Sequence, residues 1–166
     1  MGLETTGVRG VVAHYGARDT YPKFGGQLST KGLVKQAAWT FDYNDLPAGS
    51  TNKLGVSIPA YAKITAAYLE ILTGFTSTST TTDLLVGLEQ AGGTDIALDG
   101  LITAAQATQT TIATRGNIIS GASGTPAALI NASIGAAAGE LIVTSSAADL
   151  LTGRARVIVE YVLEGV

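Results

Sequence analysis

The alternation of apolar and polar residues predicts strands at two places far apart in the chain. In residues 154–164, RARVIVEYVLE, every second position from Ala155 to Leu163 is apolar or aromatic, which is the period-two pattern of a strand with one buried face. In residues 33–43, LVKQAAWTFDY, three aromatic residues alternate with polar ones in the same way. The segment DLPAGSTN (45–52) follows, and its Pro, Gly, Ser and Asn residues predict a turn.

Residues 53–90 are expected to contain further strands. The stretch KLGVSIPAYAKITAAYLEILTGF (53–75) reads as one or two strands with a break near Pro59, because proline has no N–H to donate to a neighbouring strand. Its second half is apolar on both faces apart from Glu70, so both faces are expected to be covered. After a tip rich in Ser and Thr, LLVGLEQ (84–90) again alternates.

Residues 91–144 have a weaker pattern. Turn residues fill 91–126, where four apolar residues between positions 98 and 105 lie at helical spacing, so a loop with one short helix is expected. Residues 127–134 and 140–144 are expected to form short strands.

The sum of these elements, about seven or eight short strands joined by turns, predicts an all-β fold. Strands do not alternate with helices as they would around a parallel sheet. The expected fold is therefore an antiparallel β-sandwich or jelly-roll-like domain with an extended N-terminal arm. The domain is expected to occupy residues 33–166 and the arm residues 1–32.

The arm is defined by its lack of a regular pattern. Residues 14–32, HYGARDTYPKFGGQLSTKG, contain three aromatic residues, three basic residues and four glycines, yet they show neither helical nor strand periodicity. Such a segment cannot bury a face of its own, so another surface must order it. The alternative is that it forms an N-terminal strand that completes the protein's own sheet.

Composition and charge narrow the possible functions. The chain has 166 residues, 46% of them hydrophobic and only 14% charged, and it has no cysteine for a disulfide or a thiolate metal site. Residues 1–35 hold five Lys and Arg against two acids, while the rest holds five against eleven. A nucleic-acid-binding domain would carry a larger basic patch, so no nucleic acid is expected as a partner. The N-terminus lacks a signal-peptide core and no run of eighteen apolar residues occurs, so no membrane partner is expected either.

The sequence offers no set of catalytic residues. His14 is the only histidine and lies in the arm, so a Ser-His-Asp triad is not expected. SGASGT (120–125) lacks the second glycine of a nucleophile elbow, and no lysine follows the spacing of a phosphate loop. We therefore predict that the protein is not an enzyme, and that it has no catalytic residue, no cofactor and no metal.

A resemblance gives the arm a role. The order of the segments HYGARDTYPKFGGQLSTKG, WTFDYNDLP, VSIPAYAKITAAYLEIL, DLLVGLEQ, TDIALDGLI and GRARVIVEYVLEG is similar to that of the capsid decoration, or cement, proteins of tailed bacteriophages. This resemblance implies a β-sandwich on the outer surface of the capsid of a virion, often a trimer, that bridges subunits of the major capsid protein. The alternative is a fibre, spike or lectin-like receptor-binding module of the virion.

The predicted capsid-binding residues all lie in the arm. Aromatic side chains act as rigid anchors in interfaces, and basic side chains complement an acidic surface. The residues predicted to bind the capsid are His14, Tyr15, Arg18, Tyr21, Lys23 and Phe24. A homo-oligomer, most often a trimer in proteins of this kind, is also expected, because residues 64–75 are apolar on both faces. Leu69 and Ile71 are the residues predicted at its interface.

Overall fold

The computed structural model describes residues 3–7, 10–14, 27–29, 34–46, 51–79, 81–146 and 149–163, the first three ranges by their backbone alone. The chain divides into two compact units, Met1–Lys35 and Gln36–Val166. We refer to the second unit as the body.

The N-terminal unit contains a small antiparallel sheet in the order β1-β2-β3. Its strands are β1 (Leu3–Gly7), β2 (Gly10–His14) and β3 (Gln27–Ser29). The sequence pattern predicted no strand here, because segments of three to five residues are too short to show a period of two.

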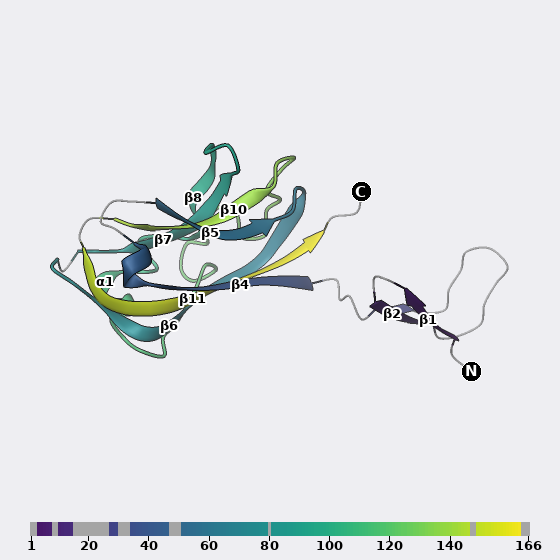
Figure 1. The fold of residues 1–166 in the computed structure, drawn as a ribbon, viewed down its shortest axis with the longest axis horizontal. Helices are drawn as coiled ribbons and strands as arrows, with labels where there is room; N and C mark the ends of the chain where they lie inside the picture. Colours follow the sequence, from purple (N-terminus) through teal and green to yellow (C-terminus); the bar gives the residue numbers. More distant parts are fainter. Residues whose placement is uncertain are drawn as a thin grey trace. The chain divides into compact units, whose positions relative to one another are not determined.

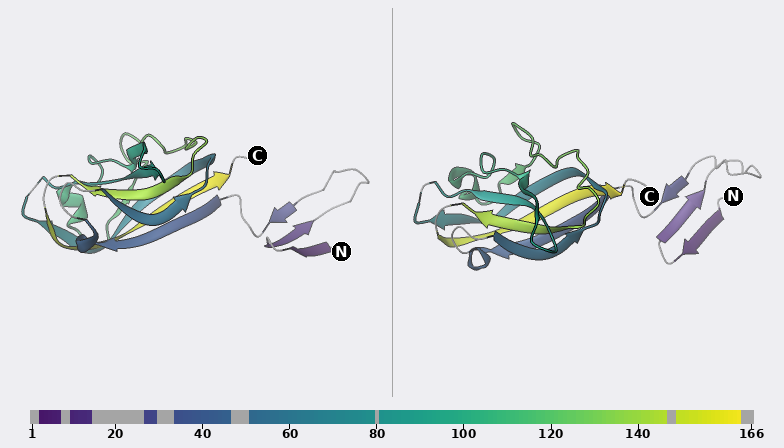
Figure 2. Two further views of the ribbon diagram at one scale, coloured as in Figure 1. Left: turned by 45° about the horizontal axis from the view of Figure 1, so that its top comes forward. Right: turned by 90° about the horizontal axis from the view of Figure 1, so that it is seen from above.

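The body is an antiparallel β-sandwich, as the sequence predicted (Figures 1 and 2). Sheet I has the order β4-β11-β6-β9, and sheet II has the order β5-β10-β7-β8. The strands are β4 (Val34–Asp42), β5 (Thr51–Ile58), β6 (Ala62–Ser77), β7 (Leu84–Gln90), β8 (Asp95–Ile102), β9 (Ile118–Ser120), β10 (Gly139–Ser145) and β11 (Leu150–Leu163). A 3-10 turn, η1 (Tyr43–Asp45), follows β4, and one short helix, α1 (Gln109–Ile112), precedes β9.

The strand order is that of one long hairpin folded into two sheets. The first four strands of the body pair with the last four in reverse order: β4 with β11, β5 with β10, β6 with β9 and β7 with β8. This arrangement is that of a jelly roll, in which a long antiparallel hairpin is wrapped into two facing sheets. The jelly-roll-like prediction is therefore confirmed.

The core lies between the two sheets and is built by alternation within each strand. In β6 and β11, residues such as Leu69, Ile71, Val157 and Val159 are almost completely buried, and their neighbours in sequence are partly exposed. The same alternation places Leu84, Val86 and Leu88 of β7 in the core. The predicted strands over 53–75, 84–90, 140–144 and 154–164 are confirmed, and the break at Pro59 falls in the turn between β5 and β6.

Strand β4 follows the predicted alternation only at its C-terminal end. Phe41 is buried in the core, whereas Trp39, two residues earlier and on the same side by alternation, is 43% exposed. Because β4 is the outermost strand of sheet I, its inner side is covered fully only near η1.

Residues 91–134 depart from the prediction. The segment contains strands β8 and β9 where a loop was expected, and the helix lies at Gln109–Ile112 instead of residues 98–105. Two register shifts in the pairing of β8 with β7 break the alternation that would have identified the strand. Residues 127–134 form turns along the edge of β6 instead of a strand, with a single bridge between Ser133 and Lys63.

Within the described part of the chain, no helix is long and apolar enough to cross a membrane.

Candidate binding face

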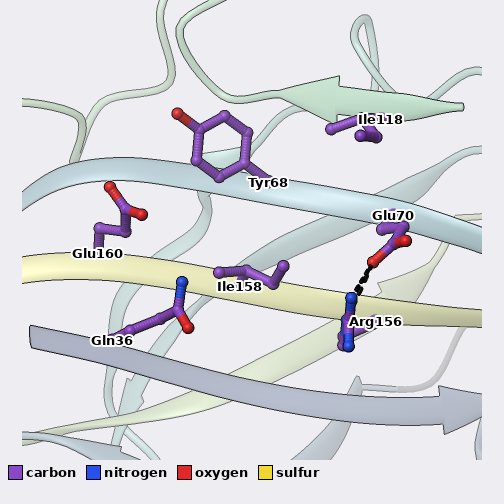
Figure 3. Close-up of a pocket in the computed structure, with 7 residues that line it drawn as sticks. All are labelled: Gln36, Tyr68, Glu70, Ile118, Arg156, Ile158 and Glu160. Carbon is purple, nitrogen blue, oxygen red and sulfur yellow. Dashed lines mark hydrogen bonds and ion pairs between the residues drawn. The ribbon is translucent and has the colours of Figure 1, made fainter.

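A shallow pocket lies on the face of sheet I that points away from the core (Figure 3). We call this surface the outer face. All four strands of the sheet contribute to the pocket, which is lined by Gln36 of β4, Arg156, Ile158 and Glu160 of β11, Tyr68 and Glu70 of β6, and Ile118 of β9. Alternation explains why these residues line the pocket, because in β6 and β11 they occupy the positions between the buried core residues.

An ion pair crosses the centre of the outer face. Arg156 and Glu70 are directly opposite each other in the antiparallel pairing of β11 with β6. The Arg156 Nε and Nη2 atoms donate hydrogen bonds of 2.9 and 2.6 Å to the same carboxylate oxygen, Glu70 Oε2. Both side chains are partly exposed, so the pair adds at most about 1 kcal/mol to the folding free energy. Its main effect is to hold the guanidinium group in one place on the surface.

Apolar and aromatic side chains lie next to this ion pair. Tyr68 is paired with Ile158 on one side and with Ser120 on the other, so the ring lies in the middle of the sheet. Ile118, at the start of β9, is 67% exposed. Arginine and tyrosine are among the side chains that contribute most binding energy to protein–protein interfaces, whose buried centres are also rich in apolar groups. This arrangement suits a docking surface better than a site for chemistry.

The described residues contain no group of three or more His, Cys, Asp and Glu side chains that could hold a metal ion. The carboxylates of the outer face, Glu70 and Glu160, have no histidine or cysteine beside them in the pocket.

A second charged cluster lies on sheet II. Glu89 and Glu140 are directly opposite each other in the pairing of β7 with β10, an unfavourable arrangement for two carboxylates. Lys53 of β5 compensates, because its Nζ lies 3.0 Å from Glu89 Oε1 and 3.7 Å from Glu140 Oε2. The hydrogen bond to Glu89 raises the pKa of Lys53 above its ordinary value, while partial burial opposes the rise. Glu89 is only 8% exposed, so this lysine compensates a nearly buried charge.

The six predicted capsid-binding residues lie at the end of β2 and in the sequence segment that follows it. Tyr15, Arg18, Tyr21, Lys23 and Phe24 lie outside the described residues. His14 is the last residue of β2, where it is opposite Leu3 and Gln27 in the backbone pairing. The prediction that these six residues contact a capsid stays a prediction.

The residues predicted at an oligomer interface need a correction. Leu69 and Ile71 are 0% and 1% exposed and belong to the core of the sandwich. The sequence correctly indicated that β6 is apolar on both faces, but these two side chains are on the inner one. A second copy of the chain could contact only the outward positions of β6, such as Tyr68.

The outer face was not predicted as a site, although its signal is present in the sequence. Tyr68 and Ile158 interrupt the polar positions of β6 and β11, and alternation alone gives their direction. What the sequence could not give is the pairing of two segments 86 residues apart, which brings Glu70 to Arg156.

The fold defines the chain as a jelly-roll β-sandwich, and the comparisons with solved structures agree. A chain of the cyanophage Pam1 capsid asymmetric unit matches with a TM-score of 0.53 at 16% identity, over 89% of this chain and 94% of that one. A chain of the capsid of Ralstonia phage GP4 matches with a TM-score of 0.55 at 22% identity, over 80% of this chain and 86% of that one. No protein-family model matches, and a search of curated proteins finds no similar sequence. At these identities the likeness concerns the fold.

Proposed function

We propose that the chain is a structural protein of a tailed-phage virion, which decorates the outer surface of the capsid and stabilises it by bridging subunits of the major capsid protein. The observation that carries the proposal is the match to chains of two phage capsid structures. Each match spans most of both chains, so the similarity includes the whole architecture and not a common substructure of a larger protein.

The division of the chain into two units supports a decoration role. A protein that bridges others needs a compact body and a means of attachment, and the chain divides into a sandwich and an N-terminal unit. Residues 1–35 hold five of the ten Lys and Arg residues of the chain, while the rest has a net excess of six acids. We propose that the N-terminal unit attaches to an acidic surface of the major capsid protein through His14, Tyr15, Arg18, Tyr21, Lys23 and Phe24.

The outer face supports contacts made by the body. A capsid-bound protein repeats across the lattice, so each copy has neighbours of its own kind or of the capsid protein. Arg156, Tyr68 and Ile118 offer a charged group, a ring and an exposed aliphatic side chain on one sheet surface. We propose that this face contacts a neighbouring subunit, as it would in the predicted trimer.

The receptor-binding alternative receives less support. A glycan-binding or spike module displays aromatic side chains on its distal loops. The described residues at 76–83 and 106–126 contain no aromatic ring, and most of them are Thr, Ser, Gly and Ala.

A reconstruction of the virion of the phage that encodes the chain tests the proposal. The expected result is density for the sandwich on the outer capsid surface at many lattice positions, together with peptides of the chain in the purified particles. Density confined to the tail or to a fibre tip would contradict decoration while retaining a virion role. Absence of the chain from purified particles would contradict both.

A further inference from the structure

The four outermost strands of the two sheets differ in how well they are protected against pairing with another chain. Strand β9 has three residues. Strand β8 has two register shifts and carries Asp95 and Asp99. Strand β5 contains Gly55 at a φ of 69° beside a register shift in its pairing with β10. Short length, charge and bulges are the usual means by which proteins block such edges.

Strand β4 has none of these protections over most of its length. It has nine residues, and the stretch QAAWTF (36–41) contains neither a charged residue nor a proline. Its one partner among the described strands is β11, so the N–H and C=O groups along its other edge have no described strand beside them. The free edge ends at Asp42, because the backbone N–H of this residue donates to Asp45 Oδ2 at 3.0 Å.

The side chains of β4 also fit an apolar contact. Trp39 is the only tryptophan of the chain and is 43% exposed, although it lies between Ala37 and Phe41 on the side that faces the core. A large ring left half-covered at the margin of a sandwich gains further burial if the sheet continues beyond it.

We propose that β4 pairs in antiparallel fashion with β4 of a second copy of this chain, about a two-fold axis at Trp39. The two copies of sheet I then form one continuous sheet of eight strands. The self-complementarity of the strand identifies a second copy as the occupant. In this register Trp39 lies opposite its own copy, Ala37 opposite Phe41, Ala38 opposite Thr40, and Gln36 opposite Asp42.

Each of these pairs is favourable. Residues directly opposite in an antiparallel pair lie on the same face, and the register keeps inward residues opposite inward ones. Small side chains face large ones, the amide of Gln36 faces the carboxylate of Asp42, and no like charges are opposed. The pairing needs no capsid, so its test does not depend on the proposed function.

Cysteine cross-linking of the full-length chain tests the register, because the protein has no cysteine of its own. Opposite Cα atoms in an antiparallel pair are about 4.5–5.5 Å apart, which a disulfide can span. A Trp39→Cys variant should therefore form a covalent dimer under mild oxidation. The control is Leu98→Cys, at a similarly exposed apolar residue (39%) on β8.

The expected initial rate for Trp39→Cys is on the order of tenfold or more above that for Leu98→Cys, because pairing raises the local thiol concentration. An Ala38→Cys variant should be slower than Trp39→Cys, since Ala38 is opposite Thr40 and its own copy is more than about 7 Å away. Equal rates for positions 39 and 98 would overturn the pairing, and a faster reaction at position 38 would overturn the register.

The fluorescence of Trp39 tests the pairing without a change to the strand. As the wild-type concentration rises, the emission should shift to shorter wavelength and acrylamide quenching should fall, in parallel with dimer formation in sedimentation experiments. An Ala38→Lys variant should not dimerise, because two lysines would approach each other across the two-fold axis, so its emission should stay that of the dilute wild-type protein as concentration rises. The control variant Ala122→Lys, at an exposed residue, should behave as wild type. A wild-type chain that stays monomeric with unchanged emission would overturn the proposal. So would a Trp39 that becomes protected only when capsid protein is added, which would identify a capsid segment as the occupant.

Discussion

At the scale of single residues, three glycines determine how the short elements pack on the two sheets. At Gly74, Gly87 and Gly121, an added Cβ would meet the backbone carbonyl oxygen of another segment at only 2.0–2.1 Å. Those carbonyls belong to Ala113, after α1, and to two residues of β8. Glycine is common in turns, but at these positions it allows close backbone approach instead.

Gly87→Ala should destabilise the body. The methyl group would meet the carbonyl oxygens of Ala97 and Leu98 at 2.0 and 2.3 Å, and backbone cannot move aside as a flexible side chain can. Overpacking of this kind costs about 1–3 kcal/mol in the free energy of unfolding, measurable from urea denaturation midpoints. Gly92→Ala is the matched control, because nothing lies within 4 Å of its added Cβ. Equal midpoints for the two variants would contradict the close approach of β8.

Lys53 should make stability depend on alkaline pH. Its pKa is raised in the folded chain, mainly by the hydrogen bond to Glu89, so the ionised lysine favours the folded state. This contribution is fully present below about 10.5 and is lost as the pH rises through the higher folded pKa. Wild type should therefore be more stable than Lys53→Gln near neutral pH, and the difference should shrink as the pH is raised past about 10.5. A difference that stays constant over that range would show that the lysine acts by packing alone.

At the scale of elements, the sequence predicted strands where a long run of residues pairs without a register shift. Strand β10 pairs in this way with β7 along its whole length, and residues 155–160 of β11 pair in this way with β6. Strand β8 was missed because its register shifts break the alternation, and β9 because it has three residues. The helix was misplaced because Leu101 and Ile102 are buried at successive positions of a strand, which mimics helical spacing.

Leu69→Ala tests the corrected role of the inner face of β6. Leu69 is fully buried in the core, so its truncation should cost about 2–5 kcal/mol in the free energy of unfolding. Ile118→Ala, at the outer face, should change stability by no more than about 0.5 kcal/mol, because Ile118 is 67% exposed. Thermal or urea unfolding of the two variants distinguishes core from surface. A small change in the free energy of unfolding for Leu69→Ala would contradict the core position and favour the interface that the sequence predicted.

The outer face illustrates what the sequence could and could not predict of a site. Alternation gave the outward direction of Glu70 and Arg156, but not that they are opposite each other. That pairing depends on the register of two strands joined by most of the jelly roll, and a shift of one residue would turn every side chain of a strand to the other face.

At the scale of the whole molecule, the division of the chain into an N-terminal unit and a body permits a test of attachment. Removal of residues 1–32 deletes four basic residues and three aromatic ones and leaves all eight strands of the sandwich. The truncated chain should keep the circular dichroism of a β-sheet protein and should lose attachment to capsids, measured by co-sedimentation. High salt should weaken attachment of the full chain only in part, because it screens exposed charges and leaves ring burial intact.

A full-length variant with Arg18→Glu and Lys23→Glu serves as the control for this truncation, since it changes charge without changing length. It should attach more weakly than wild type and lose the dependence on salt. If the truncated chain still fills its capsid positions, the N-terminal unit is not the anchor, and if it fails to fold, the unit is part of the sandwich.

The nested pairing of the strands also orders the folding of the body in time. Strands β7 and β8 are joined by a short turn and can pair as soon as both exist, but each pair outward from them closes a longer loop, and β4 must wait for β11. Because β11 lies between β4 and β6, sheet I cannot assemble on the ribosome until residues 150–163 have emerged. Until then β4, with its free edge and its exposed tryptophan, is unpaired on both sides, and a nascent chain stalled before residue 150 should be the species most prone to aggregate.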